Sequence, residues 1–254
     1  IRLRYSLAEK GYSHHTKISS SAMLISAVTD ILHNMVPEER AKYPRNFYDL
    51  TDEMFIEYLR HNGTDCSKYL MDNLLQRKLY KPVYGLKQFD PLNNGEKEEM
   101  FNELRDRDKN CRWRAERSLE IANGLREGSI VIYCPAYMMG YKTIKALVDY
   151  GNHKIGPLNE IAEEDVKEEI KYAIKNKHRA LWSMYVFVHP DIDLAARQSI
   201  HKDCCHLFGH ENELAECNQY NVSTCYNYNI RYFVRHLADI SNQNQDDKKK
   251  GDKK

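Results

Sequence analysis

Hydrophobic residues recur at helical spacing near the start of the chain. Between residues 17 and 36 the apolar positions fall three or four residues apart, namely Ile18, Ala22, Ile25, Val28, Leu32 and Met35. That spacing puts them on one face of an amphipathic helix. Pro37 follows, and a proline ends such a segment because it cannot continue the hydrogen-bonding pattern. The pattern predicts a helix over 17–36.

Two further helices are predicted downstream. The first has Thr51 as its N-cap and Gly63 at its end, since a threonine side chain accepts hydrogen bonds from the free N–H groups of the first turn. The second begins at Thr64 or Asp65 and is expected to continue to the residue before Pro82. Three helices in this stretch predict a helical bundle.

The pattern then changes to short apolar runs. Two continuous apolar stretches of strand length, each ending in a proline, lie at 129–135 (SIVIYCP) and 184–190 (MYVFVHP). The turn-rich stretch 83–97 has room for one more strand, and the charged segments 97–123 and 163–177 are predicted helices. Strands separated by helices indicate an α+β arrangement. The expected fold class is therefore mainly α with a small α+β lobe.

The same pattern divides the chain into four parts. They are a helical core (1–81), the α+β lobe (82–192), a C-terminal helical extension (193–242) and a disordered tail (243–254). The extension is predicted to open with a helix over 193–208, with Asp193 as N-cap and Gly209 after the last turn. Another helix is predicted at 228–240. The tail is polar and charged, with no apolar residues to bury.

Composition narrows the class of protein. The chain has 254 residues, 42% of them hydrophobic and 30% charged, which is typical of a globular protein. The net charge of +1 argues against a broad nucleic-acid-binding surface, and no apolar run approaches the roughly 20 residues of a membrane helix. Seven cysteines without a regular framework indicate reduced thiols and a cytoplasmic protein. Because the chain opens at Ile1 without a signal-peptide pattern, we expect further sequence upstream.

A cluster of cations lies at the predicted end of the third helix. Arg77 and Lys81 would be one helical turn apart with Lys78 between them, and Pro82 would end the helix. Cations at a helix C-terminus interact favourably with the helix dipole, and this is the simpler interpretation. The alternative is that the cluster binds an anion such as a nucleotide phosphate. The sequence alone leaves both open.

The order and spacing of several motifs resemble the C-terminal half of the HD-domain deoxynucleoside triphosphate triphosphohydrolases. The family includes bacterial dGTPase-like enzymes and the vertebrate dNTP hydrolase with a sterile-alpha-motif domain. The matching segments are RYSLAEKGYSHHTKISSSAML (4–24), LTDEMF (50–55), RKLYK (77–81), CRWRAERSLEIANGLREGSIVIYCPAYMMGYK (111–142) and YVFVHP (185–190). The resemblance covers Arg4 to Pro190 and implies the C-terminal half of an HD-domain phosphohydrolase.

The resemblance implies a nucleotide pocket near the start of the chain. By it, Arg4 would contact the substrate triphosphate and Tyr12 would pack against the deoxyribose. The fork of a guanidinium suits phosphate because it donates two hydrogen bonds at once. The chain departs from the vertebrate pattern at Ala8 and Ser13, where that enzyme has His and Gln, and this weakens the transfer of the triphosphate and base contacts.

The resemblance also implies a site for an activating nucleotide at a subunit interface. The residues that match it are His14, His15, Arg77 and Lys81. Family members assemble as oligomers, so a homo-oligomer is expected, with deoxynucleoside triphosphates as its ligands. Activation is not universal in the family, and without it Arg77 and Lys81 are relics of such a site or surface charges.

The metal ligands that define the family are absent from this sequence. None of the eleven histidines is followed by Asp. In the family the His, His-Asp and Asp ligands precede the segment that Arg4 matches, so we expect an N-terminal half to hold a divalent metal ion. The whole protein would hydrolyse dNTP to deoxynucleoside and triphosphate, and this part alone would not. The alternatives are a non-catalytic nucleotide-sensing or oligomerisation module and an HD hydrolase of another phosphorylated substrate.

Two other patterns allow different chemistry. A zinc site is conceivable because thiolates and imidazoles are close together at His201, Cys204, Cys205, His206, His210 and Cys217. No Cys-x-x-Cys pair is present, so buried thiols with surface histidines are the simpler interpretation. Tyrosines within 218–233, with Arg231 and Arg235, could stack on single-stranded nucleic acid, whereas half-buried tyrosines are more ordinary.

Overall fold

The computed structural model describes residues 7, 11, 14–87, 96–106, 110–135, 147–149, 155–157 and 182–220. Its helices are α2 (His15–Asn34), α3 (Pro37–Lys42), η2 (Tyr43–Phe47), α4 (Asp52–Asn62), α5 (Asp65–Leu75), α6 (Glu96–Arg105), α7 (Cys111–Ala122), α10 (Leu194–Phe208) and η3 (Ala215–Tyr220). Its strands are β1 (Lys81–Lys87), β2 (Ile130–Tyr133), β3 (Leu147–Asp149), β4 (Ile155–Pro157) and β5 (Ser183–Val188). The helices predicted at 163–177 and 228–240, the C-terminal tail, Arg4 and Tyr12 lie outside the described residues.

Side-chain caps fix where three of the predicted helices begin. The hydroxyl of Thr51 accepts from the N–H of Met54, and that of Thr64 accepts from the N–H of Ser67. Asp193 caps α10 in the same way, and Gly209 ends that helix in the left-handed conformation that glycine adopts without steric cost. These starting points and the end at Gly209 confirm the predictions.

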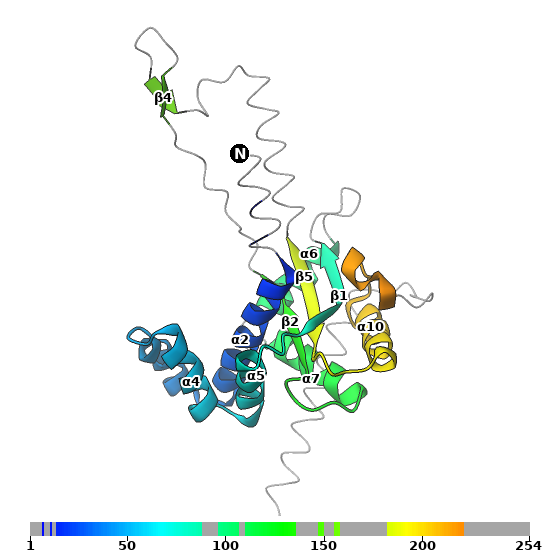
Figure 1. Ribbon diagram of the computed structural model, residues 1–254, viewed down its shortest axis with the longest axis horizontal. Coiled ribbons are helices and arrows are strands. Elements are labelled where there is room, and N and C mark those ends of the chain that lie inside the picture. Colours follow the sequence, from blue (N-terminus) through cyan, green and yellow to red (C-terminus); the bar gives the residue numbers. More distant parts are fainter. Residues whose placement is uncertain are drawn as a thin grey trace, which may run out of the picture.

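A three-stranded antiparallel sheet lies among the helices, in the order β1-β5-β2 (Figure 1). All six residues of the central strand β5 are buried. β3 and β4 form a separate two-stranded ladder. The expected fold class, mainly α with a small α+β lobe, is confirmed. The proposed division into four domains stays a prediction.

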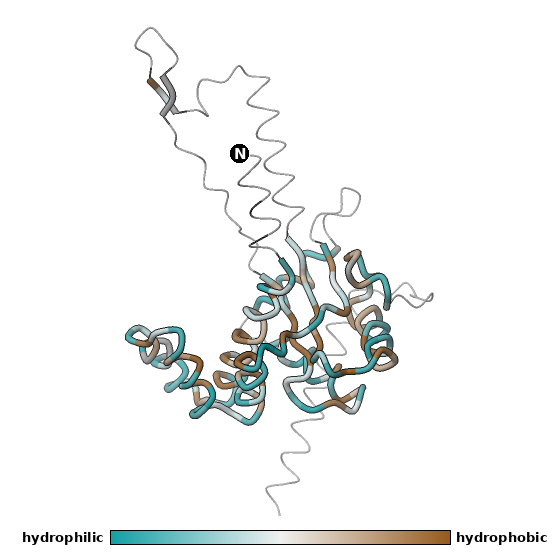
Figure 2. Tube along the Cα trace, in the orientation of Figure 1, coloured by the Kyte–Doolittle hydropathy of each residue, from teal (hydrophilic) through white to brown (hydrophobic). Residues whose placement is uncertain are grey.

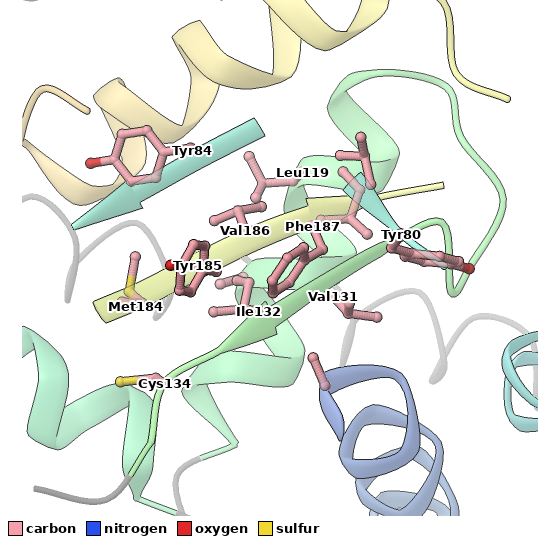
Figure 3. Packing of buried hydrophobic residues seen from close by; sticks show 14 of the residues in the cluster. Tyr80, Tyr84, Leu119, Val131, Ile132, Cys134, Met184, Tyr185, Val186 and Phe187 are labelled. Carbon is pink, nitrogen blue, oxygen red and sulfur yellow. The ribbon is translucent and has the colours of Figure 1, made fainter. Parts of the chain in front are cut away.

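The hydrophobic core joins the sheet to the helices around it. Tyr185 and Phe187 stack on one another from alternate positions of β5, with ring centroids 5.2 Å apart. Figure 3 shows Leu119 of α7 beside Val186, which belongs to the other face of the same strand. Helix α2 packs on α5 and β2, while α10 packs on β1. Figure 2 shows hydrophobic residues gathered where the helices meet the sheet. No described helix combines the length and apolar character needed to cross a membrane.

Side chains occupy both free edges of the three-stranded sheet. On the β1 edge, Asn212 accepts from the N–H of Gly85, and Glu213 donates its own N–H to the Gly85 carbonyl. On the β2 edge, the carboxylates of Glu116 and Glu120 accept from two strand N–H groups. An exposed strand edge invites pairing with another chain, so these contacts protect the small sheet.

Two helix predictions were wrong in their extent. The third helix was expected to continue to Lys81, but it ends at Leu75, and Lys81 is the first residue of β1. The charged helix predicted over 97–123 is two helices, α6 and α7, and Asn110 before α7 has a left-handed φ of 54°. Asparagine tolerates that conformation better than most residues, so the break has a local cause.

Candidate functional site

The connection between α5 and β1 carries the cations that the sequence singles out. Helix α5 ends in a Schellman motif, because the N–H of Lys78 donates to the Asn73 carbonyl at 2.9 Å and that of Arg77 to the Leu74 carbonyl at 3.1 Å. Such a motif needs one left-handed residue, which is usually glycine. Here it is Arg77, with a φ of 58°. The side chain of Arg77 is exposed at this position.

This geometry corrects the earlier interpretation of the cluster. Arg77 and Lys81 are not one helical turn apart, since Arg77 lies in a turn and Lys81 is the first residue of a strand. The last turn of α5 contains no basic residue. Arg77 and Lys78 directly follow the C-cap of α5, so the helix-dipole interpretation still applies to them, whereas Lys81 belongs to the strand. Lys78 lies 3.5 Å from the exposed carboxylate of Asp191.

The start of α2 is attached to the start of β1. The buried hydroxyl of Ser19 donates to the backbone carbonyl of Tyr80 at 2.8 Å, and the Tyr80 hydroxyl donates to the Gly128 carbonyl. His15 is one helical turn before Ser19 and so lies on the same face of α2. Since Lys81 follows Tyr80 directly, the hydrogen bond from Ser19 holds α2 next to the start of β1.

His14 lies at the N-cap of the same helix. Its Nδ1 accepts from the N–H of Thr16 at 3.3 Å, and its ring stacks on that of His15 with centroids 4.3 Å apart. No acidic residue occupies the first turn of α2. The N-terminus of a helix carries partial positive charge. The positive end of the helix dipole and the two imidazoles therefore lie together at the start of α2. Arg4 and Tyr12, outside the described residues, stay predictions.

A buried histidine, His189, links the end of β5 to α5. His189 follows β5, and its Nδ1 accepts from the N–H of Asp191 at 3.2 Å, so Nε2 carries the proton and donates to Asn73 Oδ1 at 3.2 Å. Its ring stacks on Tyr69 of α5. Burial lowers the pKa of His189, which favours the neutral imidazole. In the sequence His189 lies between a predicted strand and Pro190, and nothing there indicates its bond to α5.

A second network of polar groups is buried between α2, α5 and α7. Asp30 accepts hydrogen bonds from the Thr64 hydroxyl and from Trp113 Nε1, the latter at 3.1 Å. Arg117 lies 3.5 Å from Asp30 and also pairs with Glu120. Burial raises the pKa of Glu120 to about 7, against the opposing effect of Arg117. No periodicity in the sequence revealed this network, because its members occupy ordinary helical positions.

The group considered for zinc does not form a metal site in the described part of the chain. No three His, Cys, Asp or Glu side chains among the described residues are arranged to hold a metal ion. His201 is buried rather than on the surface, and its Nδ1 lies 3.0 Å from the carbonyl of Val83. Burial raises the pKa of the Cys204 thiol well above its usual value, which opposes formation of a thiolate. The six described cysteines are free thiols, as expected.

The comparisons with known proteins give one match. The model of the family described as the HD associated region matches residues 4–212. The searches of curated proteins and of solved structures found no match. The matched residues include α2, α5 and β1 and so contain the region around His15, Arg77 and Lys81.

Proposed function

Because the chain belongs to the family of HD-associated regions, we propose that it serves an HD-domain phosphohydrolase as the part without the metal. The reaction we assign to the whole protein is hydrolysis of a dNTP to deoxynucleoside and triphosphate. The role we assign to this chain is to bind nucleotide, with Arg77, Lys81, His14 and His15 holding phosphate at an interface between subunits of a homo-oligomer.

One observation carries this proposal. The hydrogen bond from Ser19 to the Tyr80 carbonyl joins two segments that are 61 residues apart. It holds α2, the helix at whose start His14 and His15 lie, against the residue that precedes Lys81. A triphosphate needs several donors at once, and charge-assisted hydrogen bonds to phosphate are stronger than neutral ones. The exposed Arg77, held in a left-handed turn, adds a guanidinium that can reach solvent.

The described residues do not fit the divalent ion that such chemistry uses. They offer no three-ligand group, and none of the chain's histidines precedes an aspartate. We therefore derive no metal-dependent step from this chain. In the proposal, the ion belongs to the HD domain that this region accompanies.

The substrate pocket is proposed from the resemblance alone. Arg4 would donate to the triphosphate, and the ring of Tyr12 would pack on the deoxyribose and leave no room for a 2′-hydroxyl. Replacing the ring in the HD-domain protein, Tyr12→Ala, should then narrow the difference in hydrolysis rate between dGTP and GTP. An unchanged ratio would remove Tyr12 from the pocket.

Substrate profiling of the HD-domain protein that contains this region tests the function as a whole. We expect dNTPs to yield deoxynucleoside and triphosphate, measured by chromatography of the products. Release of phosphate from another phosphorylated compound would replace the dNTP assignment with a different HD hydrolase. Nucleotide binding without hydrolysis would indicate a sensing module.

A further inference from the structure

The carboxylates of Glu116 and Glu120 take the place of a neighbouring strand on β2. They lie one turn apart on α7, and their Oε1 atoms accept from the N–H groups of Ile132 and Ile130 at 2.7 Å and 2.9 Å. Oε2 of Glu116 accepts from the hydroxyl of Ser26 on α2, at 3.2 Å. Glu116 therefore joins three elements, α2, α7 and β2, by two hydrogen bonds.

The two carboxylates differ in their partners. Glu120 forms a direct ion pair with Arg117. The hydrogen-bond partners of Glu116, by contrast, are the neutral N–H of Ile132 and the neutral hydroxyl of Ser26. Glu116 is 1% exposed, so water does not solvate a charge there. A buried carboxylate without a cation in contact favours its neutral form.

The charges around Glu116 come from each element packed against it. On α7 they are Arg112 and Arg117, which lower the pKa of Glu116, and Glu120, while β2 contributes no charged side chain. Asp30 on α2 and the Cys66 thiol on α5 lie against Arg117. Arg117 already lies against both Asp30 and Glu120, and Arg112 is only half-buried. Neither arginine therefore forms an ion pair with Glu116.

We propose that Glu116 is a proton-linked latch, neutral when α2 is fastened to β2 and loosened when the proton leaves for solvent. In the neutral form, Oε2–H donates to the Ser26 hydroxyl, which accepts as readily as it donates, and Oε1 still accepts from Ile132. Loss of the proton leaves a buried negative charge beside Glu120. Like charges at that spacing repel, so the contact of α7 with α2 and β2 weakens.

The direction of the pH dependence follows from linkage. Burial raises the pKa of Glu116 in the folded protein, so the folded state binds this proton more tightly than the unfolded state does. Stability from Glu116 is therefore highest at low pH and falls as the pH rises from the ordinary glutamate range through the raised pKa. The consequence is a loosening of α2 in alkaline solution, with no nucleotide involved.

The substitution Glu116→Gln tests the latch, because glutamine copies the neutral acid and cannot titrate. We expect equal melting temperatures for wild type and E116Q at pH 6, and a melting temperature about 5 °C higher for E116Q at pH 9. Hydrogen exchange at the amide of Ile132, relative to its intrinsic rate, should rise between pH 6 and pH 9 in the wild type and rise less in E116Q, where Glu120 still titrates.

Glu120→Gln is the matched control one turn away. It removes the ion pair with Arg117 and also the titration of Glu120, whose raised pKa of about 7 lies in the same range. It should therefore lower the melting temperature at both pH values and leave in place the part of the pH dependence that comes from Glu116. The proposal is overturned if E120Q rather than E116Q abolishes the pH dependence, or if E116Q is less stable than wild type at pH 6. Carbon-13 NMR of the side-chain carboxyls gives an independent measure, since one raised titration should be lost in E116Q while that of Glu120, with a pKa of about 7, remains.

Discussion

Arg77 shows how much of the candidate site depends on the backbone of one residue. In the left-handed region a side chain brings Cβ close to the backbone, and the cost is about 1–2 kcal/mol for residues other than glycine. The chain carries arginine there with a φ of 58°, at a position where a Schellman motif favours glycine. A strained residue with an exposed charge is a reason to look for a ligand at this turn.

The substitution Arg77→Gly should raise the free energy of unfolding by about 0.5–1 kcal/mol, because glycine adopts this conformation without the Cβ contact. Urea denaturation measures the change. Arg77→Ala keeps the Cβ atom and should stay within about 0.5 kcal/mol of the wild type. Equal stability of the glycine and alanine variants would show that the turn is not strained.

Ser19 is the residue that attaches α2 to β1, and its neighbour provides the comparison. Removing its hydroxyl by Ser19→Ala leaves the buried carbonyl of Tyr80 without its donor and should cost about 1–2 kcal/mol. Ser20→Ala removes only a local bond to the carbonyl of Lys17 in an exposed part of α2 and should be nearly neutral. Denaturation of both variants measures the change in the free energy of unfolding. Similar losses in Ser19→Ala and Ser20→Ala would show that the bond to Tyr80 does not stabilise the attachment of α2.

At the scale of elements, the small sheet depends on what covers its edges. A sheet of three strands leaves a row of unpaired backbone groups on each outer strand. The α7 carboxylates occupy the β2 edge, and the segment before η3 occupies the β1 edge through Asn212 and Glu213. Residues 210 to 213 therefore belong to the same packed unit as the strand at 81–87, although the two are far apart in sequence.

The close approach on the β1 edge needs a glycine. A Cβ atom built on Gly85 would lie 1.9 Å from Cδ1 of Leu214 and 2.8 Å from the carbonyl oxygen of Met184. Gly85→Ala should therefore cost about 1–3 kcal/mol, measured by thermal or urea denaturation. Leu214→Ala in the same chain should recover part of the loss by making room. A neutral Gly85→Ala would mean that the 212–214 segment is not packed on the strand as described.

At the scale of the whole molecule, the sequence predicted what depends on local pattern. The apolar runs identified β2 and β5, and the capping residues Thr51, Thr64 and Asp193 identified helix starts. It could not predict that α5 ends at Leu75, because arginine is an uncommon residue for a left-handed turn. The motif pattern indicated the HD association, which the family match supports.

Polar contacts between residues far apart in the chain could not be predicted from the sequence. Asp30 and Arg117 are separated by 87 residues, and neither position carries a local signal that the other would lie beside it. The same holds for Ser19 and Tyr80, whose bond defines the candidate site. Such pairs depend on how the elements pack, which hydrophobic spacing on one element does not report.

Calorimetric titration of dGTP into the full chain tests the central claim most directly. The claim is that His14, His15, Arg77 and Lys81 bind nucleotide phosphate. We predict saturable binding that weakens as salt rises and that falls by about tenfold or more in the double variant Arg77→Ala, Lys81→Ala. Lys87→Ala, an exposed lysine at the other end of β1, should bind like the wild type. Equal affinity of the double variant and the wild type, or no binding by the wild type, would contradict the account.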